Sequence, residues 1–139
     1  RSPRRSGFYE YTYYRNGRTR AESASEDRHF VFIHLTSQNQ SQSEIRLPSY
    51  SQFHLVDGDD SHTPISPIWG DRRFQIKSPV DGLTWGNPET IEGEAEHSGW
   101  LVFKLPSDLS RYDVALEAPI PVNESTSIMV RWENPAPEN

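Results

Sequence analysis

The chain has 139 residues, of which 33% are hydrophobic, 12% are aromatic and 24% are charged, and it contains no cysteine. This length suits one domain with a core of its own, and the aromatic content is too high for a disordered chain. The lack of cysteine excludes disulfides, thiolate metal sites and cysteine nucleophiles, and the lack of a run of about eighteen apolar residues excludes a membrane-spanning helix.

Basic charge is concentrated at the start of the chain. Residues 1–20 carry a net charge of +5, whereas the whole chain carries −6 and the remainder therefore −11. The acidic body disfavours nucleic acid, while a short basic segment can contact an acidic partner. We expect a flexible basic arm over residues 1–7, a folded β-sandwich domain over residues 8–133 and a proline-containing tail over residues 134–139, with any upstream targeting or anchoring segment removed.

Tyrosines mark the first expected strand, Phe8–Arg15, because three of them alternate onto one face. Asn16-Gly17 then favours a tight turn, and Arg18–Ala21 continues as a short second strand. The tyrosine face is a candidate interaction surface formed by Tyr9, Tyr11 and Tyr13. We favour pairing of this strand within its own chain. The alternative is that it adds to the sheet of a neighbouring molecule and builds a filament.

Arg28–Thr36 is the first strongly apolar segment, and its continuous apolar character places it at the centre of a sheet. A polar loop over Ser37–Ser43 follows. Ser49–Val56 alternates again, with Phe53 and Leu55 expected to point inward.

Three carboxylates crowd into the turn that follows. Asp57, Asp59 and Asp60 supply the oxygen ligands that calcium prefers. The spacing fails as an EF-hand loop, because His62 stands at its glycine position and Ile68 at its last acidic position. A calcium site of another type is a hypothesis, and a solvated hairpin turn is the favoured interpretation. We expect no other cofactor.

Residues 62–88 contain repeated proline and glycine, together with Trp69 and Trp85. Exposed tryptophan and tyrosine side chains can form flat platforms for sugar rings or anchors for a partner protein. The favoured interpretation is that both tryptophans hold this long segment against the domain, while Trp100 and Trp132 pack in the core.

The remaining strands are expected over Arg72–Lys77, Glu96–Leu105, Arg111–Glu117 and Thr126–Trp132. Ser98 lies in the most apolar of these, but Glu96 stands where a nucleophile elbow requires glycine. No other catalytic motif is present, and no separated pair of buried carboxylates can be singled out for a glycosidase. We therefore expect no enzyme.

Two triplets match the N-glycosylation pattern, Asn39-Gln40-Ser41 and Asn123-Glu124-Ser125. Both lie in predicted loops, so Asn39 and Asn123 are candidate glycosylation sites. They agree with a surface location.

The order of several segments is similar to that of a known family. These segments are His29–Leu35, a polar loop that contains Asn39, Phe53-His54-Leu55 before an Asp/Gly turn, and Gly99–Pro106. Over roughly Tyr9 to Glu117 the chain resembles the telokin-like, immunoglobulin-like β-sandwich domain of unknown function of secreted or membrane-anchored proteins of bacteria and archaea. The resemblance implies an extracytoplasmic, non-catalytic domain and assigns no catalytic residue.

The sequence thus predicts an all-β fold, an immunoglobulin-like antiparallel β-sandwich of about seven to nine strands. The expected function is a non-catalytic structural or protein-binding module, secreted or anchored at the cell surface. Its partner is expected to be a protein bound through aromatic anchors and the basic arm, or a second copy of the chain bound through the N-terminal strand, and not nucleic acid. The alternative function is a carbohydrate-binding module that uses exposed tryptophan and tyrosine platforms.

Overall fold

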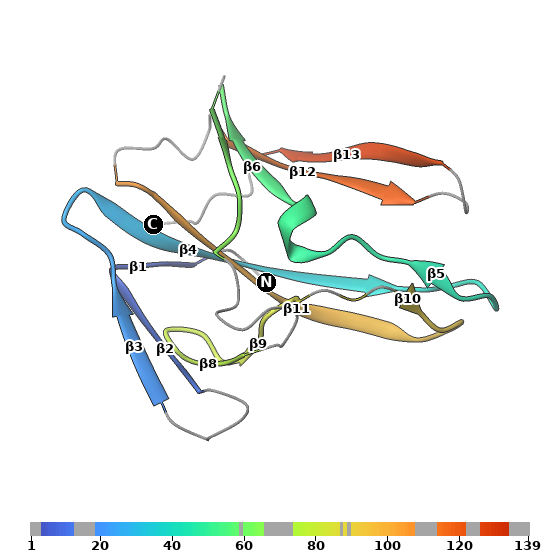
Figure 1. The fold of residues 1–139 in the computed structure, drawn as a ribbon, viewed down its shortest axis with the longest axis horizontal. Coiled ribbons are helices and arrows are strands. Elements are labelled where there is room, and N and C mark those ends of the chain that lie inside the picture. Colours follow the sequence, from blue (N-terminus) through green and yellow to red (C-terminus); the bar gives the residue numbers. More distant parts are fainter. Residues whose placement is uncertain are drawn as a thin grey trace.

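The structure is a computed structural model that describes residues 4–12, 19–58, 60–65, 74–86, 88, 90–107, 114–121 and 126–133 (Figure 1). The regular elements of these residues are strands and one 3-10 turn, η1 (Tyr50–Gln52). In chain order the strands are β1 (Arg4–Ser6), β2 (Phe8–Thr12), β3 (Thr19–Ser23), β4 (Arg28–Gln38), β5 (Ile45–Arg46), β6 (His54–Asp57), β7 (Asp60–His62), β8 (Gln75–Ser78), β9 (Gly82–Leu83), β10 (Thr90–Ile91), β11 (Glu96–Pro106), β12 (Val114–Pro121) and β13 (Ser127–Glu133). The all-β sandwich is confirmed, and eight of its thirteen described strands have four residues or more.

The strands form four sheets, with the orders β1-β4-β11, β10-β5, β13-β12-β6-β7 and β3-β2-β8-β9. In Figure 1 the long strands β4 and β11 cross the middle of the molecule. The sheet that contains β6, β12 and β13 lies above them, and the sheet that contains β2, β3 and β8 lies below.

The pairing of β4 with β11 is antiparallel and runs without a break from Arg28 opposite Pro106 to Gln38 opposite Glu96. Successive side chains of a strand point to opposite faces. Val31 and Ile33 therefore enter one core, while Phe30 and Phe32 enter another. Burial on both faces explains why these segments read as continuous apolar runs, and the prediction that Arg28–Thr36 is central is confirmed.

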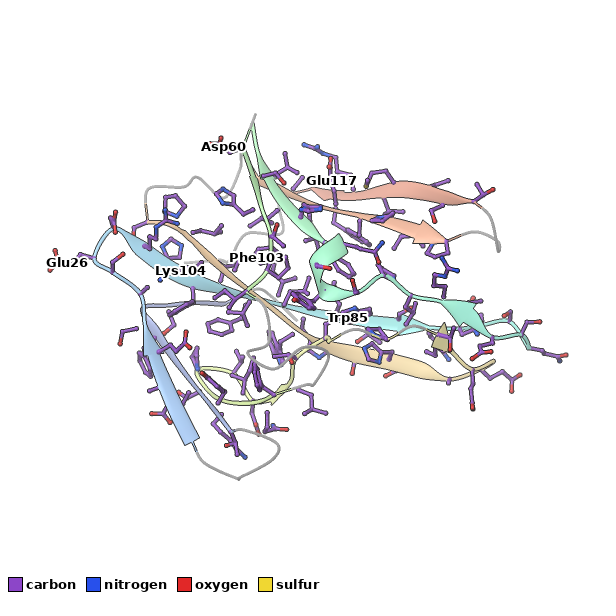
Figure 2. All side chains as sticks on the ribbon, viewed as in Figure 1. Glu26, Asp60, Trp85, Phe103, Lys104 and Glu117 are labelled. Carbon is purple, nitrogen blue, oxygen red and sulfur yellow. The ribbon has the colours of Figure 1, made fainter. Side chains whose placement is uncertain are left out.

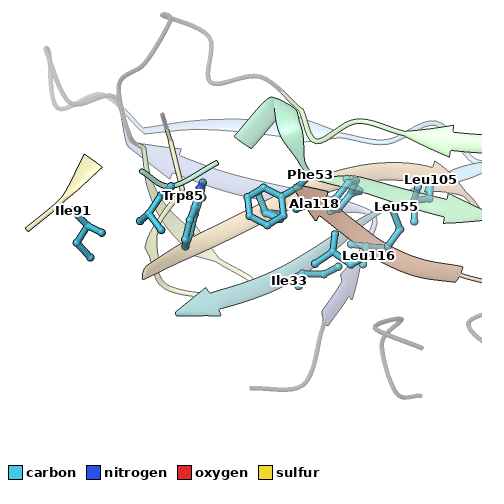
Figure 3. Close-up of a cluster of buried hydrophobic side chains, with 12 residues drawn as sticks. Ile33, Phe53, Leu55, Trp85, Ile91, Leu105, Leu116 and Ala118 are labelled. Carbon is cyan, nitrogen blue, oxygen red and sulfur yellow. The ribbon is translucent and has the colours of Figure 1, made fainter. Parts of the chain in front are cut away.

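We call the two cores the upper and the lower core, after the sheets that cover them, which lie above and below β4 and β11 in Figure 1. The upper core, drawn in Figure 3, joins β4 and β11 to the β13-β12-β6-β7 sheet, and its buried residues are Val31, Ile33, Leu47, Phe53, Leu55, Trp85, Ile91, Leu101, Phe103, Leu105, Leu116 and Ala118. The lower core joins the other face to the β3-β2-β8-β9 sheet, and its buried residues are Tyr11, Phe30, Phe32, Phe74, Ile76, Val80, Trp100 and Val102. The expected inward positions of Phe53 and Leu55 are confirmed.

Trp85 holds the segment before β10 against β11. Its backbone N–H donates to the carbonyl oxygen of Trp100 at 2.9 Å, and its ring nitrogen Nε1 donates to the carbonyl oxygen of Pro48 at 2.8 Å. Gly99 makes this close approach possible, because a Cβ atom at that position would lie 2.6 Å from the backbone nitrogen of Trp85. A side chain at residue 99 would push the two backbones apart.

Asn39 follows the end of β4, and its side chain is 2% exposed. Its Nδ2 atom donates to the carbonyl oxygens of Ser43, Ile91 and Glu92 at 2.6, 3.2 and 3.1 Å, and its Oδ1 accepts from the backbone N–H of Ser41 at 3.0 Å. An N-linked glycan would be joined to this same nitrogen. The prediction of a glycosylation site at Asn39 is therefore wrong for the folded chain, and Asn123 lies outside the described residues.

The strand pairing of the N-terminal region contradicts two further predictions. The prediction of a flexible arm over residues 1–7 is wrong for β1, because Arg4–Ser6 pairs with Phe30–Phe32 of β4. The alternative of self-assembly through the N-terminal strand is also wrong for β2, because that strand pairs with both β3 and β8 of its own chain. Both of its edges are occupied, and the favoured interpretation of pairing within the chain is confirmed.

β12 extends four residues beyond the expected end at Glu117 and includes Pro119 and Pro121. Proline normally ends a central strand, because it has no N–H to donate. β6 pairs with β12 only over Val114–Glu117, so the later residues of β12 have β13 alone as a neighbour in the described part of the sheet. Proline is tolerated there as it is at an edge.

The variant Gly99→Ala tests the contact between Trp85 and β11. We expect it to lower the free energy of unfolding by about 2 kcal/mol or more, because two backbone segments must separate. Gly7→Ala is the matched control, since its Cβ would have nothing within 4 Å. Urea denaturation of both variants measures the difference, and equal midpoints would contradict the close approach.

The variants Asn39→Ala and Asn39→Asp test the buried amide. Both remove the amide donor that the three carbonyl oxygens share, and the aspartate also places a negative charge beside them, so we expect losses of about 3 kcal/mol for alanine and more for aspartate. The exposed neighbour Gln40 supplies the control Gln40→Ala. Chemical denaturation gives the values, and wild-type stability of Asn39→Asp would show that this amide is not a structural donor.

Candidate interaction surface

Two residues of the expected aromatic platforms are buried. Tyr11 is 1% exposed, packs on Phe74 with ring centroids 5.1 Å apart and donates from its hydroxyl to Oε1 of Glu22 at 3.0 Å. Trp85 is 2% exposed and lies inside the molecule in Figure 2. The prediction that they form an exposed binding surface is wrong, and for Trp85 the interpretation that it holds the long segment in place is confirmed. The side chain of Tyr9 and all of Tyr13 and Trp69 lie outside the described residues.

The environment of the Trp85 ring is fully occupied. Its ring meets Phe53 and His97 edge to face, with centroids 5.5 and 4.5 Å away. Nε2 of His97 donates to the carbonyl oxygen of Trp85 at 2.9 Å. This aromatic cluster therefore stabilises the fold and offers no open ring to a ligand.

The acidic turn forms a hairpin, as expected. β6 and β7 pair up to Asp57 opposite Asp60, and Gly58 has the positive φ of 57° that suits a tight turn. Asp60 is exposed at the tip of this hairpin (Figure 2). The calcium hypothesis stays a prediction, because Asp59 and the side chain of Asp57 lie outside the described residues.

Among the described residues, titratable groups give no candidate for a metal or catalytic site besides the acidic turn. Within the described part of the chain, no group of three or more His, Asp or Glu side chains could hold a metal ion. The pKa of Asp27 is lowered chiefly by a hydrogen bond from the Ser25 hydroxyl, 2.7 Å away, in the exposed turn before β4. On the outer face of β6, Nδ1 of His54 is buried and has no hydrogen-bond partner among these residues.

Exposed apolar side chains gather on β13. Ile128 is 52% exposed, Met129 is 62% exposed and Trp132 is 38% exposed. The other two large exposed apolar residues in the described chain, Phe8 and Leu83, lie on different strands of the other outer sheet. β13 thus carries most of the large apolar side chains that this part of the molecule leaves in water.

The upper core ends before it reaches β13. Leu116 and Ala118 of β12 are fully buried, but their neighbours across the strand pair, Trp132 and Val130, are only partly covered. The inner face of the sheet therefore continues past the core. The prediction that Trp132 packs in the core is wrong for this reason, whereas the same prediction for Trp100 is confirmed.

β13 is also an edge strand. In the described structure it pairs with β12 alone, and Figure 1 shows it on the side of the sheet away from β6. Edges are usually protected by charges, proline, short length or a covering segment. β7 and β1 have three residues each, and the outer side of β11 receives hydrogen bonds from the backbone N–H groups of Ile65 and Trp85. β13 has seven residues, no proline and one charge before its last residue.

That charge, Arg131, lies on the outer face of the sheet and is bound to Glu117 of β12, with Nη1 of the arginine 2.7 Å from Oε1 of the glutamate. The guanidinium is therefore directed back over β12 and away from the edge. The sequence pattern predicts the strand but not its exposure. The available signal was Met129, an apolar residue between two inward-facing positions, which makes both faces of the strand apolar.

No helix in the described residues is long and apolar enough to cross a membrane. A search of curated proteins gave no match to this chain.

The solved structures that are similar to this one include those of two bacterial proteins. A functionally unknown protein from Listeria monocytogenes EGD-e has a TM-score of 0.52 and 14% identity, over 76% of this chain and 58% of that protein. A protein of Bacillus subtilis subsp. subtilis str. 168 named "putative lipoprotein (ycdA)" has a TM-score of 0.50 and 12% identity, over 96% of this chain and 38% of that protein. At these identities the likeness shows the fold alone. The chain spans less than two thirds of either protein.

A family model described as "Domain of unknown function (DUF4352)" matches residues 11–126. This match runs from β2 to the residue before β13 and covers most of the chain. The chain therefore belongs to the family of this domain of unknown function, DUF4352.

Proposed function

We propose that this chain is a non-catalytic, extracytoplasmic module that binds a protein by accepting a β-strand at the edge formed by β13. The observation that carries the proposal is the coincidence, among the described residues, of an edge without a neighbouring strand and exposed apolar side chains on both faces of β13. Strand addition uses both features, since backbone hydrogen bonds supply affinity and alternate side chains supply specificity.

The binding strand would lie beside β13 and extend the sheet. Its inward side chains would cover Ile128, Val130 and Trp132, which would complete the upper core beyond β12. Its outward side chains would meet Met129 and the aliphatic part of Arg131. Tryptophan and arginine are frequent anchors in protein interfaces. The proposal assigns the chain no reaction and no cofactor.

The extracytoplasmic location at the cell surface is part of the same proposal. It is supported by the resemblance of the segments in Sequence analysis to immunoglobulin-like domains of secreted and membrane-anchored proteins. The name of the similar Bacillus subtilis protein, which calls it a lipoprotein, agrees with this location. The acidic body, which disfavours nucleic acid, also agrees with a protein partner. The carbohydrate alternative loses two of its five platform residues, because Tyr11 and Trp85 are buried.

A photo-crosslinking amino acid at position 129 tests this function in cells that produce the chain. Met129 is highly exposed at the centre of the edge, so we expect ultraviolet light to yield a protein adduct of defined mass. The same amino acid at position 83 is the matched control, because Leu83 is also an exposed apolar strand residue but lies on another sheet. Adducts of equal yield from both positions, or none from position 129, would contradict the proposal.

Protection from an added protease tests the location separately. We expect the chain on intact cells to be digested by external protease, since an extracytoplasmic module at the cell surface is accessible from outside. A cytoplasmic protein of the same cells is the control for lysis. Complete protection of the chain until the cells are broken would contradict the surface location while leaving the binding edge untouched.

A further inference from the structure

β13 is complementary to itself. Its sequence is Ser-Ile-Met-Val-Arg-Trp-Glu, with Ile128, Val130 and Trp132 on the inner face and Met129 and Arg131 on the outer face. Residues directly opposite each other in an antiparallel pair point to the same face. If two copies of β13 pair about a two-fold axis perpendicular to the sheet, inner residues of one copy lie opposite inner residues of the other. The residue beside the axis lies opposite the same residue of the second copy.

Three positions of this axis bring most of the strand into contact, namely Met129, Val130 and Arg131. An axis at Arg131 places two arginines opposite each other, which is unfavourable. An axis at Met129 leaves Trp132 beyond the end of the opposing strand. An axis at Val130 pairs all seven residues of both strands.

The register at Val130 also gives each side chain a suitable neighbour. Ile128 lies opposite Trp132 of the second copy, and an aromatic residue beside a β-branched one is a favourable cross-strand pair. Arg131, whose charge is already bound by Glu117, lies opposite the neutral Met129 of the second copy. No two like charges meet directly along the strand pair, so the charges agree with this arrangement.

We propose that the strand received by β13 is β13 of a second copy, paired antiparallel about a two-fold axis at Val130. The two four-stranded sheets would then join into one sheet of eight strands, which is within the usual size of sheets. This inference rests on the proposed function and names its partner. The two exposed inner strips, each formed by Ile128, Val130 and Trp132, would cover each other along the axis.

The size of the contact sets the expected strength. A strand pair of seven residues with a few flanking side chains falls below the roughly 1,200 Å² at which standard interfaces begin, and contacts of that class are transient. The negative net charge of each copy adds a weak repulsion that salt screens. We expect a reversible dimer with a dissociation constant in the micromolar range, which becomes tighter as salt is raised.

Single cysteines test the register, because the natural chain has none. Residues 130 of the two copies would be directly opposite, with Cβ atoms about 5 Å apart, whereas residues 127 would be six positions apart, about 20 Å. We expect Val130→Cys to form a disulfide-linked dimer under mild oxidation at least about tenfold more readily than Ser127→Cys. Ser127 is the more exposed of the two, so simple accessibility predicts the opposite order.

Charges at the axis provide a second test that uses the full chain. Light scattering should give twice the 16.0 kDa mass of one chain for the wild type at high concentration. Val130→Glu and Val130→Lys should each weaken the dimer at least about tenfold, because each variant faces its own charge, and an equimolar mixture should recover it. Leu83→Glu and Leu83→Lys are the controls and should leave the mass unchanged. Thermal melting confirms that each variant is folded.

The outcomes separate this inference from the proposed function. A chain that remains monomeric at about 500 µM, far above the expected dissociation constant, overturns the dimer. A dimer that links through Ser127→Cys as readily as through Val130→Cys, or that a mixture of charges does not recover, overturns the register. Photo-adducts from position 129 whose mass shows a different protein overturn the dimer and support the proposed function. No adduct and no dimer overturns both.

Discussion

The pairing of β4 with β11 is the interaction on which the rest of this structure depends. All eleven residues of each strand pair, and both faces of the pair are buried along much of its length. In an antiparallel protein this is unusual, since one face of such a sheet often meets water. Here the pair forms a shared wall, and the upper and lower cores both require its side chains.

Because both faces of the β4–β11 pair are buried, the segments that pack against it must follow narrowly defined paths. The chain between β9 and β10 crosses β11 so closely that only glycine fits at residue 99, and Trp85 then fills the space beside η1. At the other end, Asn39 ties the residues after β4 to those around β10. Polar atoms at these positions are buried and paired, because an unpaired donor or acceptor there would cost stability.

The sequence predicted β4 and β11 well, because burial on both faces produces a long continuous apolar run that no other segment of the chain shows. Arg28–Thr36 and Glu96–Leu105 match β4 and β11 to within two residues. The hairpin at Asp57–Asp60 was also predictable, since its glycine has a local conformational role. Asn39 was not, because a polar residue in a polar loop looks the same whether its amide meets water or three carbonyl oxygens.

β13 shows the main limit of pattern reasoning. Alternation predicts which side chains share a face, but it does not reveal whether another layer covers that face. Ile128, Val130 and Trp132 have the pattern of a core strand, yet the buried residues of the upper core include Leu116 and Ala118 of β12 and none of β13.

In a chain that acts as a monomer, a polar residue or a proline at such an edge would hinder pairing with other chains. β12 carries two prolines where its own edge opens, while β13 carries an isoleucine, a methionine and a valine in succession. Within the described ranges, the fold therefore protects one edge and leaves its neighbour without a pairing strand. This contrast between β12 and β13 is the physical reason to regard β13 as a binding strand and not merely as a strand that the core leaves uncovered.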